Sequence, residues 1–149
     1  MHILISINKQ TLQLMEQNVV LHSYPISSAK NGIGFEEGSY QTPTGNFLIS
    51  EKHGHDAPIH TIFKGRKAVD LWNPEHHSDQ DLVTTRILWL EGLDPNNLNT
   101  KERYIYIHGT NHEDSIGSPS SCGCIRMRNL DIIELFDAVT ENTPVQILP

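Results

Sequence analysis

The chain has 149 residues, enough for one domain with a substantial hydrophobic core. Eleven Lys and Arg against eighteen Asp and Glu give a formal net charge of −7, which argues against binding to nucleic acid or anionic lipid. No stretch is apolar over the roughly eighteen residues that a membrane span requires. We therefore expect a single domain, residues 1–149, that binds neither nucleic acid nor membrane.

Three short runs near the N-terminus alternate apolar and polar residues, which is typical of β-strands. They are His2–Asn8, Thr11–Met15 and Val19–Tyr24, and polar turns separate them. The pattern predicts a three-stranded antiparallel meander. The glycine-containing segment Ile26–Gly38, which follows Pro25, is predicted to be a polar loop.

A turn signal, Thr42-Pro43-Thr44-Gly45, leads into a predicted strand at Asn46–Ser50. The pattern then weakens over the histidine-rich segment 53–81. Within it, Lys67–Trp72 has the composition of a strand. We expect the rest of that segment to be a polar loop or lid over a pocket.

The second half of the chain contains further strands and one helix. Strands are predicted at Ile87–Leu90 and Arg103–His108, and a closing strand at Thr143–Leu148. Apolar spacing predicts a helix at Leu130–Val139 with Asn129 as its N-cap. Many strands and one helix indicate a mainly β domain, a sandwich or a barrel-like fold.

The two cysteines, Cys122 and Cys124, are separated by one glycine. A bridge between them would close a very small, strained ring, so we expect no structural disulfide. Neither this C-x-C spacing nor the nine histidines match a zinc-binding pattern. The sequence therefore predicts no metal site and no cofactor.

Cys124 is the candidate nucleophile, because it lies on a glycine turn before the predicted helix, whose dipole favours a thiolate. Cysteine is also common as a small buried apolar residue, and Cys122 is a rival nucleophile that we instead expect to line the site. The N–H groups of Gly123 and Cys124 can form an oxyanion hole, to which Ser121 can add a hydroxyl.

His108 is the candidate general base. Period two places it on one face of its strand with Tyr104 and Tyr106. A lone strand histidine is usually structural, but a flexible connector allows this one to approach Cys124. His112, in the following loop, is the alternative base.

A histidine base needs a hydrogen-bond partner that fixes its tautomer. Glu113 and Asp114 are close in sequence but not obviously spaced for this role. A backbone carbonyl, such as that of Gly109, can serve instead.

Arg126 has two interpretations. It is either an ordinary surface arginine or a guanidinium that binds a substrate carboxylate beside the thiol. We favour the second, with Tyr106 and Cys122 also lining the substrate site.

Together these motifs resemble the catalytic domain of the L,D-transpeptidases, cysteine enzymes of peptidoglycan. The family signature is a strand ending in His-Gly, a loop, and Ser/Thr-x-Gly-Cys followed by Ile/Val and Arg or Asn. The corresponding segments are His108-Gly109-Thr110-Asn111, Ser121-Cys122-Gly123-Cys124-Ile125-Arg126-Met127 and, for the family's T-P-x-G-x-F turn, Thr42-Pro43-Thr44-Gly45-Asn46-Phe47. Cys122 departs from the pattern, since many members carry His, Lys or Arg there.

The resemblance implies the family's mainly β fold, with Cys124 as nucleophile, His108 as base and the Gly109 carbonyl orienting the imidazole. The implied substrate is a muropeptide stem, attacked at the L-centre of its third residue, often diaminopimelate, with release of terminal D-alanine. Carbapenem-type β-lactams are implied as acylating inhibitors.

The acceptor of the acyl group decides the reaction: an amine gives cross-linking and water gives L,D-carboxypeptidase activity. If Met1 is the native start, the lack of a leader predicts a cytoplasmic L,D-carboxypeptidase that trims recycled murein peptides. A removed leader would place the protein in the cell envelope and favour cross-linking. The alternatives of other classes are a non-catalytic muropeptide-binding domain, which the Cys124 and His108 pair argues against, and a zinc-binding regulator.

Overall fold

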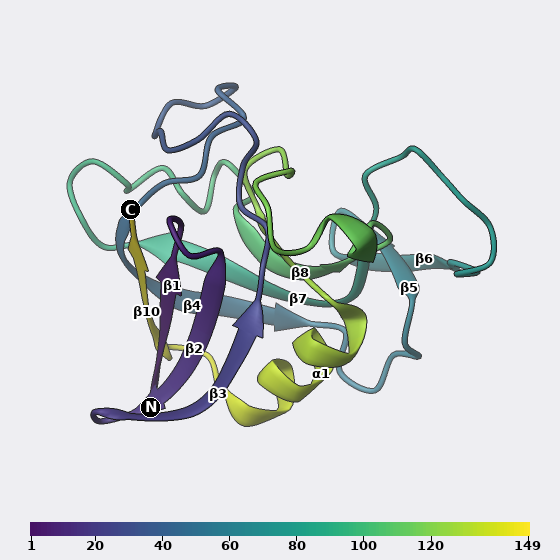
Figure 1. Cartoon of the computed structure of the whole chain (residues 1–149), viewed down its shortest axis with the longest axis horizontal. Coiled ribbons are helices and arrows are strands. Elements are labelled where there is room, and N and C mark those ends of the chain that lie inside the picture. Colours follow the sequence, from purple (N-terminus) through teal and green to yellow (C-terminus); the bar gives the residue numbers. More distant parts are fainter.

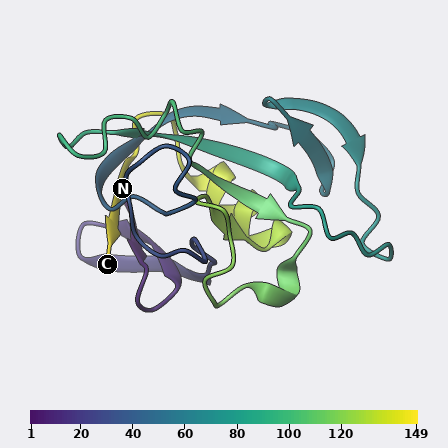
Figure 2. The ribbon, with the colours of Figure 1, turned by 90° about the horizontal axis from the view of Figure 1, so that it is seen from above.

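The computed structural model describes residues 1–149 as a strongly curved β-sheet that wraps around one α-helix (Figures 1 and 2). The strands are β1 His2–Ser6, β2 Thr11–Glu16, β3 Val19–Pro25, β4 Gly45–His53, β5 Thr61–Lys64, β6 Lys67–Leu71, β7 Val83–Gly92, β8 Tyr106–Thr110, β9 Ile125–Met127 and β10 Pro144–Leu148. The helices are the 3-10 turn η1 Glu113–Ser115 and α1 Asn129–Ala138. Neither has the length and apolar character needed to cross a membrane.

The strands follow the order β3-β2-β1-β10-β4-β7-β5-β6, and β8 and β9 extend the sheet from β7. The predicted antiparallel meander of β1, β2 and β3 is confirmed. β7 is the central strand, since its Ile87 pairs with His53 of β4 on one edge and with His108 of β8 on the other. The mainly β prediction is therefore correct.

The hydrophobic core lies between the concave face of the sheet and α1 (Figure 2). Ile132, Leu135 and Phe136 of α1 are buried against apolar residues of the strands. At the outer side of the helix, the hydroxyl of Tyr24 in β3 donates a hydrogen bond of 2.6 Å to Glu134. The helix is thus held between the meander and the β7–β8 pair.

The predicted N-cap role of Asn129 is wrong, because Asn129 is the first residue of α1 and its side chain points into the core. Its Oδ1 accepts hydrogen bonds of 2.6 Å from the hydroxyls of Thr84 and Thr85, and its Nδ2 donates to the carbonyl of Thr110 at 2.9 Å. The carboxylate of Glu113 accepts the Asn129 N–H at 2.7 Å instead. A long-range carboxylate therefore caps the helix, at the end where the dipole favours negative charge.

The predicted polar loop over residues 53–81 contains a β-hairpin. The suggested strand at Lys67–Trp72 is confirmed as β6, but the partner strand β5 was not predicted. β5 has only four residues and a bulge, and every residue of β6 is exposed, so the alternation that reveals a half-buried strand is missing. The hairpin extends the sheet beyond β7 (Figure 1).

Two boundaries near the motifs differ from the prediction. The strand expected from Arg103 begins only at Tyr106, because Tyr104 lies in a turn with φ of +58°. The three-residue strand β9 was not predicted, and it lies between the Cys124 turn and α1. Cys124 is therefore not at the helix N-terminus, and the expectation that the helix dipole favours its thiolate is wrong.

Candidate active site

β8 and β9 bring the two predicted catalytic residues to one face of the sheet. These strands are parallel, with Ile107 opposite Ile125 and His108 opposite Arg126. Because side chains alternate along a strand, the two isoleucines enter the core while His108 and Arg126 share the other face. Cys124 immediately precedes β9 and lies on the same face as Arg126.

The thiol of Cys124 is held by the main chain just before and at the start of β8. The N–H of Tyr106 donates to the sulfur at 3.3 Å, and the thiol donates to the carbonyl of Tyr104, also at 3.3 Å. Cys124 is half-buried and packs against a small apolar cluster. That cluster consists of Phe63, Ile87, Trp89 and Tyr106.

The surroundings of Cys124 favour the protonated thiol. Burial raises its pKa to about 12, and the negative charge of Asp81 acts in the same direction. The N–H of Tyr106 and the charge of Arg126 oppose this shift without cancelling it. A base is therefore needed to remove the proton when the thiol reacts.

His108 is 2% exposed and its ring is fixed by its own neighbour. Its Nδ1 is 2.5 Å from the carbonyl oxygen of Gly109, which can only accept, so Nδ1 carries the proton and Nε2 is free to take one. Burial lowers the pKa of His108, which keeps the imidazole neutral. Gly109 cannot carry a side chain, since a Cβ there would lie 2.6 Å from the Asn129 Oδ1 and from the Thr84 carbonyl oxygen.

The turn before Cys124 is stabilised by two hydroxyl groups. Ser121 donates to the carbonyl of Cys124 at 2.6 Å and accepts the N–H of Gly123 at 3.2 Å, so its hydroxyl is used within the turn. Thr42, from the predicted Thr-Pro turn, donates to the carbonyl of Gly123 at 2.8 Å. The N–H of Cys124 has no acceptor in the structure and is available to an oxyanion.

The interpretation of Arg126 as a surface residue is wrong, because the residue is 4% exposed. Its Nη2 lies 2.9 Å from Oδ2 of Asp81, and its Nε is buried without a partner. The charge of Asp81 raises the pKa of both His108 and Cys124, whereas that of Arg126 lowers both. Asp81 belongs to no motif, and only the tertiary fold identifies it as a carboxylate whose charge acts on both His108 and Cys124.

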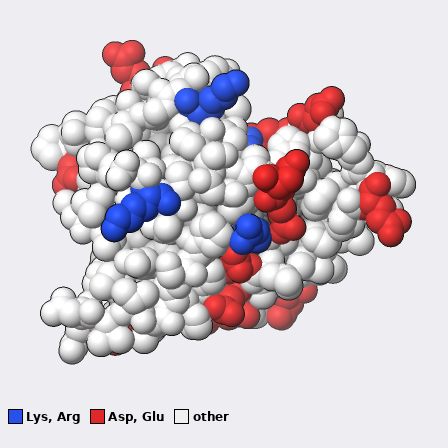
Figure 3. Space-filling model, viewed as in Figure 1, with Lys and Arg blue, Asp and Glu red and all other residues white.

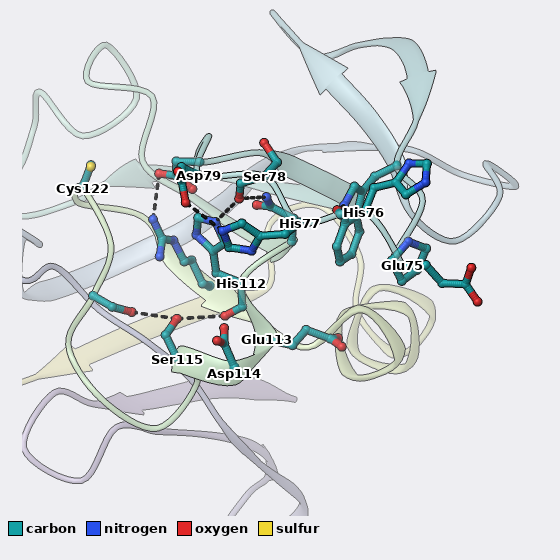
Figure 4. A pocket seen from close by; sticks show the side chains of 16 residues that line it. Glu75, His76, His77, Ser78, Asp79, His112, Glu113, Asp114, Ser115 and Cys122 are labelled. Carbon is teal, nitrogen blue, oxygen red and sulfur yellow. Dashed lines mark hydrogen bonds and ion pairs between the residues drawn. The ribbon is translucent and has the colours of Figure 1, made fainter.

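A cleft of about 700 Å³ lies beside Arg126 (Figure 4). Segment 72–81 forms one wall, segment 111–115 another, and Cys122 lies at its rim with its side chain exposed. Polar residues predominate in its lining, which consists of Trp72, Pro74, Glu75, His76, His77, Ser78, Asp79, Asp81, Asn111, His112, Glu113, Asp114, Ser115, Ser120, Cys122 and Arg126. Asp and Glu side chains are numerous on the half of the molecule that carries β5 and β6 (Figure 3).

His112 and Glu113, which lie near the motifs in sequence, both have structural partners. The alternative base His112 places Nε2 2.9 Å from the carbonyl of Ser78 across the cleft (Figure 4). Glu113 caps α1, as described above. No group of three or more His, Cys, Asp and Glu side chains is arranged to hold a metal ion.

The β5–β6 hairpin reaches the aromatic residues next to the thiol through Arg66 at its turn. The guanidinium carbon lies 4.6 Å from the ring centre of Trp89 and 5.4 Å from that of Tyr104. Arg66 also donates a hydrogen bond of 3.2 Å to the hydroxyl of Tyr106. The segment predicted to be a lid is therefore attached beside Cys124 by two cation–π contacts and a hydrogen bond.

This fold and cysteine–histidine arrangement define the class of protein. The structure of an L,D-transpeptidase from Mycobacterium smegmatis is similar to this one, with a TM-score of 0.63 and 16% sequence identity. The match covers 99% of this chain and 58% of the Mycobacterium smegmatis chain. The structure of the LD transpeptidase LdtMt1 in complex with imipenem matches 98% and 57%, with a TM-score of 0.62 and 19% identity. At such identities the likeness establishes the fold: it is that of the L,D-transpeptidases.

Sequence comparison establishes the family. The L,D-transpeptidase catalytic domain family, YkuD, matches residues 1–147. The putative L,D-transpeptidase YkuD of Bacillus subtilis is 31% identical over 147 residues, which are 98% of this chain and 65% of that protein. The probable L,D-transpeptidase ErfK/SrfK of Escherichia coli is 54% identical over 46 residues, 31% of this chain and 15% of its own. The chain belongs to the L,D-transpeptidase catalytic domain family of enzymes, and it spans just under two thirds of the length of the Bacillus relative.

Proposed function

We propose that this chain catalyses acyl transfer on peptidoglycan stem tetrapeptides through a thioester on Cys124. The bond cleaved joins the L-centre of the third residue to the terminal D-alanine. The observation that carries this proposal is the arrangement of His108, whose Nδ1–H is bonded to Gly109 so that Nε2 is the free, unprotonated nitrogen on the face shared with Cys124. Membership of the family supports the choice of substrate.

In the acylation step, Nε2 of His108 takes the thiol proton as the sulfur attacks the carbonyl carbon of the third residue. The raised pKa of Cys124 and the lowered pKa of His108 favour proton transfer during attack over a pre-formed ion pair. The carbonyl oxygen becomes an oxyanion, which the free N–H of Cys124 stabilises. The N–H of Gly123, held only by a 3.2 Å bond to Ser121, is the second donor.

The intermediate collapses when the C–N bond to D-alanine breaks. The imidazolium of His108 gives its proton to the leaving nitrogen, so D-alanine departs as the neutral amine and the peptide remains as a thioester. In this scheme Arg126 binds a carboxylate of the substrate, and Tyr106 and the exposed Cys122 line its path to the thiol.

We propose water as the main acceptor, which makes the activity that of an L,D-carboxypeptidase of murein recycling. Water attacks the thioester carbonyl while His108 takes its proton, and the thiol leaves with that proton as the tripeptide acid forms. The polar lining of the cleft that contains Cys122 and Arg126 supports this choice, because such a cleft admits water. An amine acceptor, giving cross-links, remains the second candidate on the strength of the family.

The experiment is mass spectrometry of purified protein incubated with a tetrapeptide and an excess of an acceptor peptide. Tripeptide and free D-alanine as the main products support hydrolysis. Predominant cross-linked dimer contradicts hydrolysis and supports the transpeptidase alternative. Binding of the tetrapeptide without any product assigns the chain to the non-catalytic binding class.

Carbapenems provide an independent test of the thioester chemistry. The LD transpeptidase LdtMt1 has a known structure in complex with imipenem. We propose that imipenem acylates this chain at Cys124, which peptide mapping after incubation identifies.

The location of the protein has its own test. Fractionation of cells that express the protein shows whether it is found in the cytoplasmic fraction or in the envelope fraction.

A further inference from the structure

Apart from the cleft beside Arg126, the surface has a hollow of about 360 Å³, which we call the Trp89 hollow. Its lining consists of Trp89, Glu91, Leu98, Lys101, Glu102 and Tyr104. Tyr104 stacks on Trp89, with ring centres 5.8 Å apart and ring planes at 25°. Tyr104 is 54% exposed, so its ring is accessible to a ligand. The hollow therefore combines an aromatic surface with charged side chains of both signs.

The two aromatic rings are held in place before any ligand binds. Trp89 is buried, and its indole N–H donates a hydrogen bond of 3.1 Å to the carbonyl of Lys101. Tyr104 has a φ of +58°, in the left-handed region that glycine and asparagine adopt more easily than tyrosine. Such strained positions concentrate at functional sites. A tyrosine kept in this conformation indicates that its ring has a role.

The Trp89 hollow is connected to the catalytic cysteine. A smaller hollow of about 150 Å³ shares Glu102 and Tyr104 with it, and shares Cys122 with the large cleft. The carbonyl of Tyr104 accepts the hydrogen bond of the Cys124 thiol at 3.3 Å. Trp89 belongs to the apolar cluster against which Cys124 packs. A group bound at Tyr104 is therefore close to a group bound at Cys124.

The charges around the rings favour an uncharged ligand. The guanidinium carbon of Arg66 lies 4.6 Å from the ring centre of Trp89, and Nζ of Lys101 lies 5.0 Å from it. These two cations already take up the attraction of the ring for positive charge, and they would repel a third. The carboxylates of Glu91 and Glu102 would repel an anion.

A pyranose ring has the properties that remain. The C–H groups on one of its faces can pack against an aromatic ring, and its hydroxyls can donate to carboxylates and accept from an ammonium group. Glu91, Glu102 and Lys101 provide both kinds of partner beside the ring of Tyr104.

The length of a stem peptide matches the path from the thiol to this hollow. In peptidoglycan the first residue of the stem is joined to an N-acetylated amino sugar, whose carboxyl is used in that bond, so the sugar is uncharged. With the third residue at Cys124, the sugar precedes three residues, which span at most about 10 Å when extended. Because Tyr104 contacts the thiol through its own carbonyl, its ring lies within that span.

We infer that the Trp89 hollow is a subsite for the amino sugar to which the stem peptide is attached. This inference rests on the proposed function and goes further, because it makes sugar-linked muropeptides the preferred substrates over free peptides. It also assigns a binding role to the side chain of Tyr104.

The test compares two tetrapeptides that differ only in the group on the first residue. One is linked to N-acetylmuramic acid and the other to an acetyl group, so both lack a free amine at that end. The rate of D-alanine release gives kcat/KM for each, and the ratio of the two values measures the effect of the sugar. We expect the sugar-linked peptide to react with a kcat/KM about ten-fold higher or more, through stacking and charge-assisted hydrogen bonds.

Tyr104→Asn removes the ring and introduces a residue that tolerates the left-handed backbone. In this variant the ratio should fall toward one, whereas Tyr104→Phe, which keeps the ring, should retain the preference. The matched control is Tyr40→Asn, because Tyr40 is also exposed, has a φ of +56° and lines the smaller hollow but not the Trp89 hollow. The control should keep the ratio. A general loss of activity cancels, since each ratio compares two substrates on one protein.

Equal kcat/KM for the two substrates on the unmodified protein would overturn the inference. An equal fall of the ratio in Tyr104→Asn and Tyr40→Asn would also overturn it. If Tyr104→Asn keeps the ratio but alters the response to added acceptor peptide, the hollow binds that peptide instead of the sugar.

A second variant decides the question if Tyr104→Asn does not fold. Glu102→Ala changes an exposed residue of the same hollow and should lower the ratio, and an unchanged ratio would count against the sugar subsite. Failure of both peptides to release D-alanine is a different result, which rejects the proposed function itself.

Discussion

The backbone N–H of Tyr106 donates a hydrogen bond to the sulfur of Cys124 across 3.3 Å. Cys124 directly precedes β9, and β9 runs parallel to β8, which begins at Tyr106. Cys124 and Tyr106 therefore lie side by side, and this brings the sulfur to the N–H. An N–H donor stabilises a thiolate, and here it opposes the stronger effect of burial. The cysteine is thus oriented by the sheet, and burial favours its protonated thiol.

We predict that Cys124→Ala abolishes D-alanine release and that Cys122→Ala retains most of it. Cys124 is half-buried and shares a face with His108, whereas Cys122 is exposed at the cleft rim. Steady-state rates of both variants check this, with circular dichroism to confirm that each is folded. Comparable loss of activity in the two variants would contradict the assignment of the nucleophile.

We predict that the acid limb of the kcat/KM profile has its midpoint below the ordinary histidine pKa of about 6.5. His108 must be neutral to accept the thiol proton, and burial lowers its pKa. The activity should therefore persist when the pH falls below the pKa of an ordinary imidazole, and it should disappear only when His108 is protonated. Rates measured from acid to neutral pH check this, and a midpoint above about 6.5 is the contrary outcome.

The same shift makes folding stability depend on pH. The unfolded chain protonates His108 near its ordinary pKa of about 6.5, while the folded chain resists protonation until a lower pH. The stability is therefore unaffected above the unfolded-state pKa of about 6.5, and it decreases as the pH falls from there to the lower folded-state pKa. Urea unfolding at several pH values should show a smaller acid-induced loss in His108→Gln than in the unmodified protein.

We predict that Asn129→Ala lowers the free energy of unfolding by roughly 3 kcal/mol, because buried groups lose their partners. Asn129 joins β7 to the end of β8 through Thr84, Thr85 and Thr110. Asn31→Ala is the control, since its exposed side chain makes one long bond of 3.3 Å and should cost less than about 0.5 kcal/mol. Denaturant unfolding of the two variants measures both values, and equal costs would contradict the role of Asn129.

We predict that Arg66→Ala increases the rate of Cys124 alkylation by iodoacetamide. Arg66 attaches the β5–β6 hairpin to Trp89, Tyr104 and Tyr106, next to the thiol. Without these contacts the hairpin should leave the thiol more accessible. Lys64→Ala, an exposed change on the same hairpin, is the control and should leave the rate unchanged. An unaltered rate in Arg66→Ala would show that the hairpin does not limit access.

The sequence by itself predicted those features that depend on neighbouring residues. Period-two alternation identified the meander and the face shared by Tyr106 and His108, since side chains of a strand alternate wherever the strand lies. The contact between His108 and the carbonyl of Gly109 was likewise predictable, because it joins adjacent residues. The glycine turn before Cys124 was clear for the same reason.

Only the tertiary structure decided the electrostatics of the site and the contacts between distant segments. The pairing of Arg126 with Asp81 and the contact of Arg66 with Tyr106 join positions far apart in the chain, and no spacing rule reports them. The raised pKa of Cys124 depends on burial, whereas the sequence suggested a helix dipole that β9 separates from the thiol. Burial and long-range pairing are properties of the assembled sheet, which is why local pattern could not supply them.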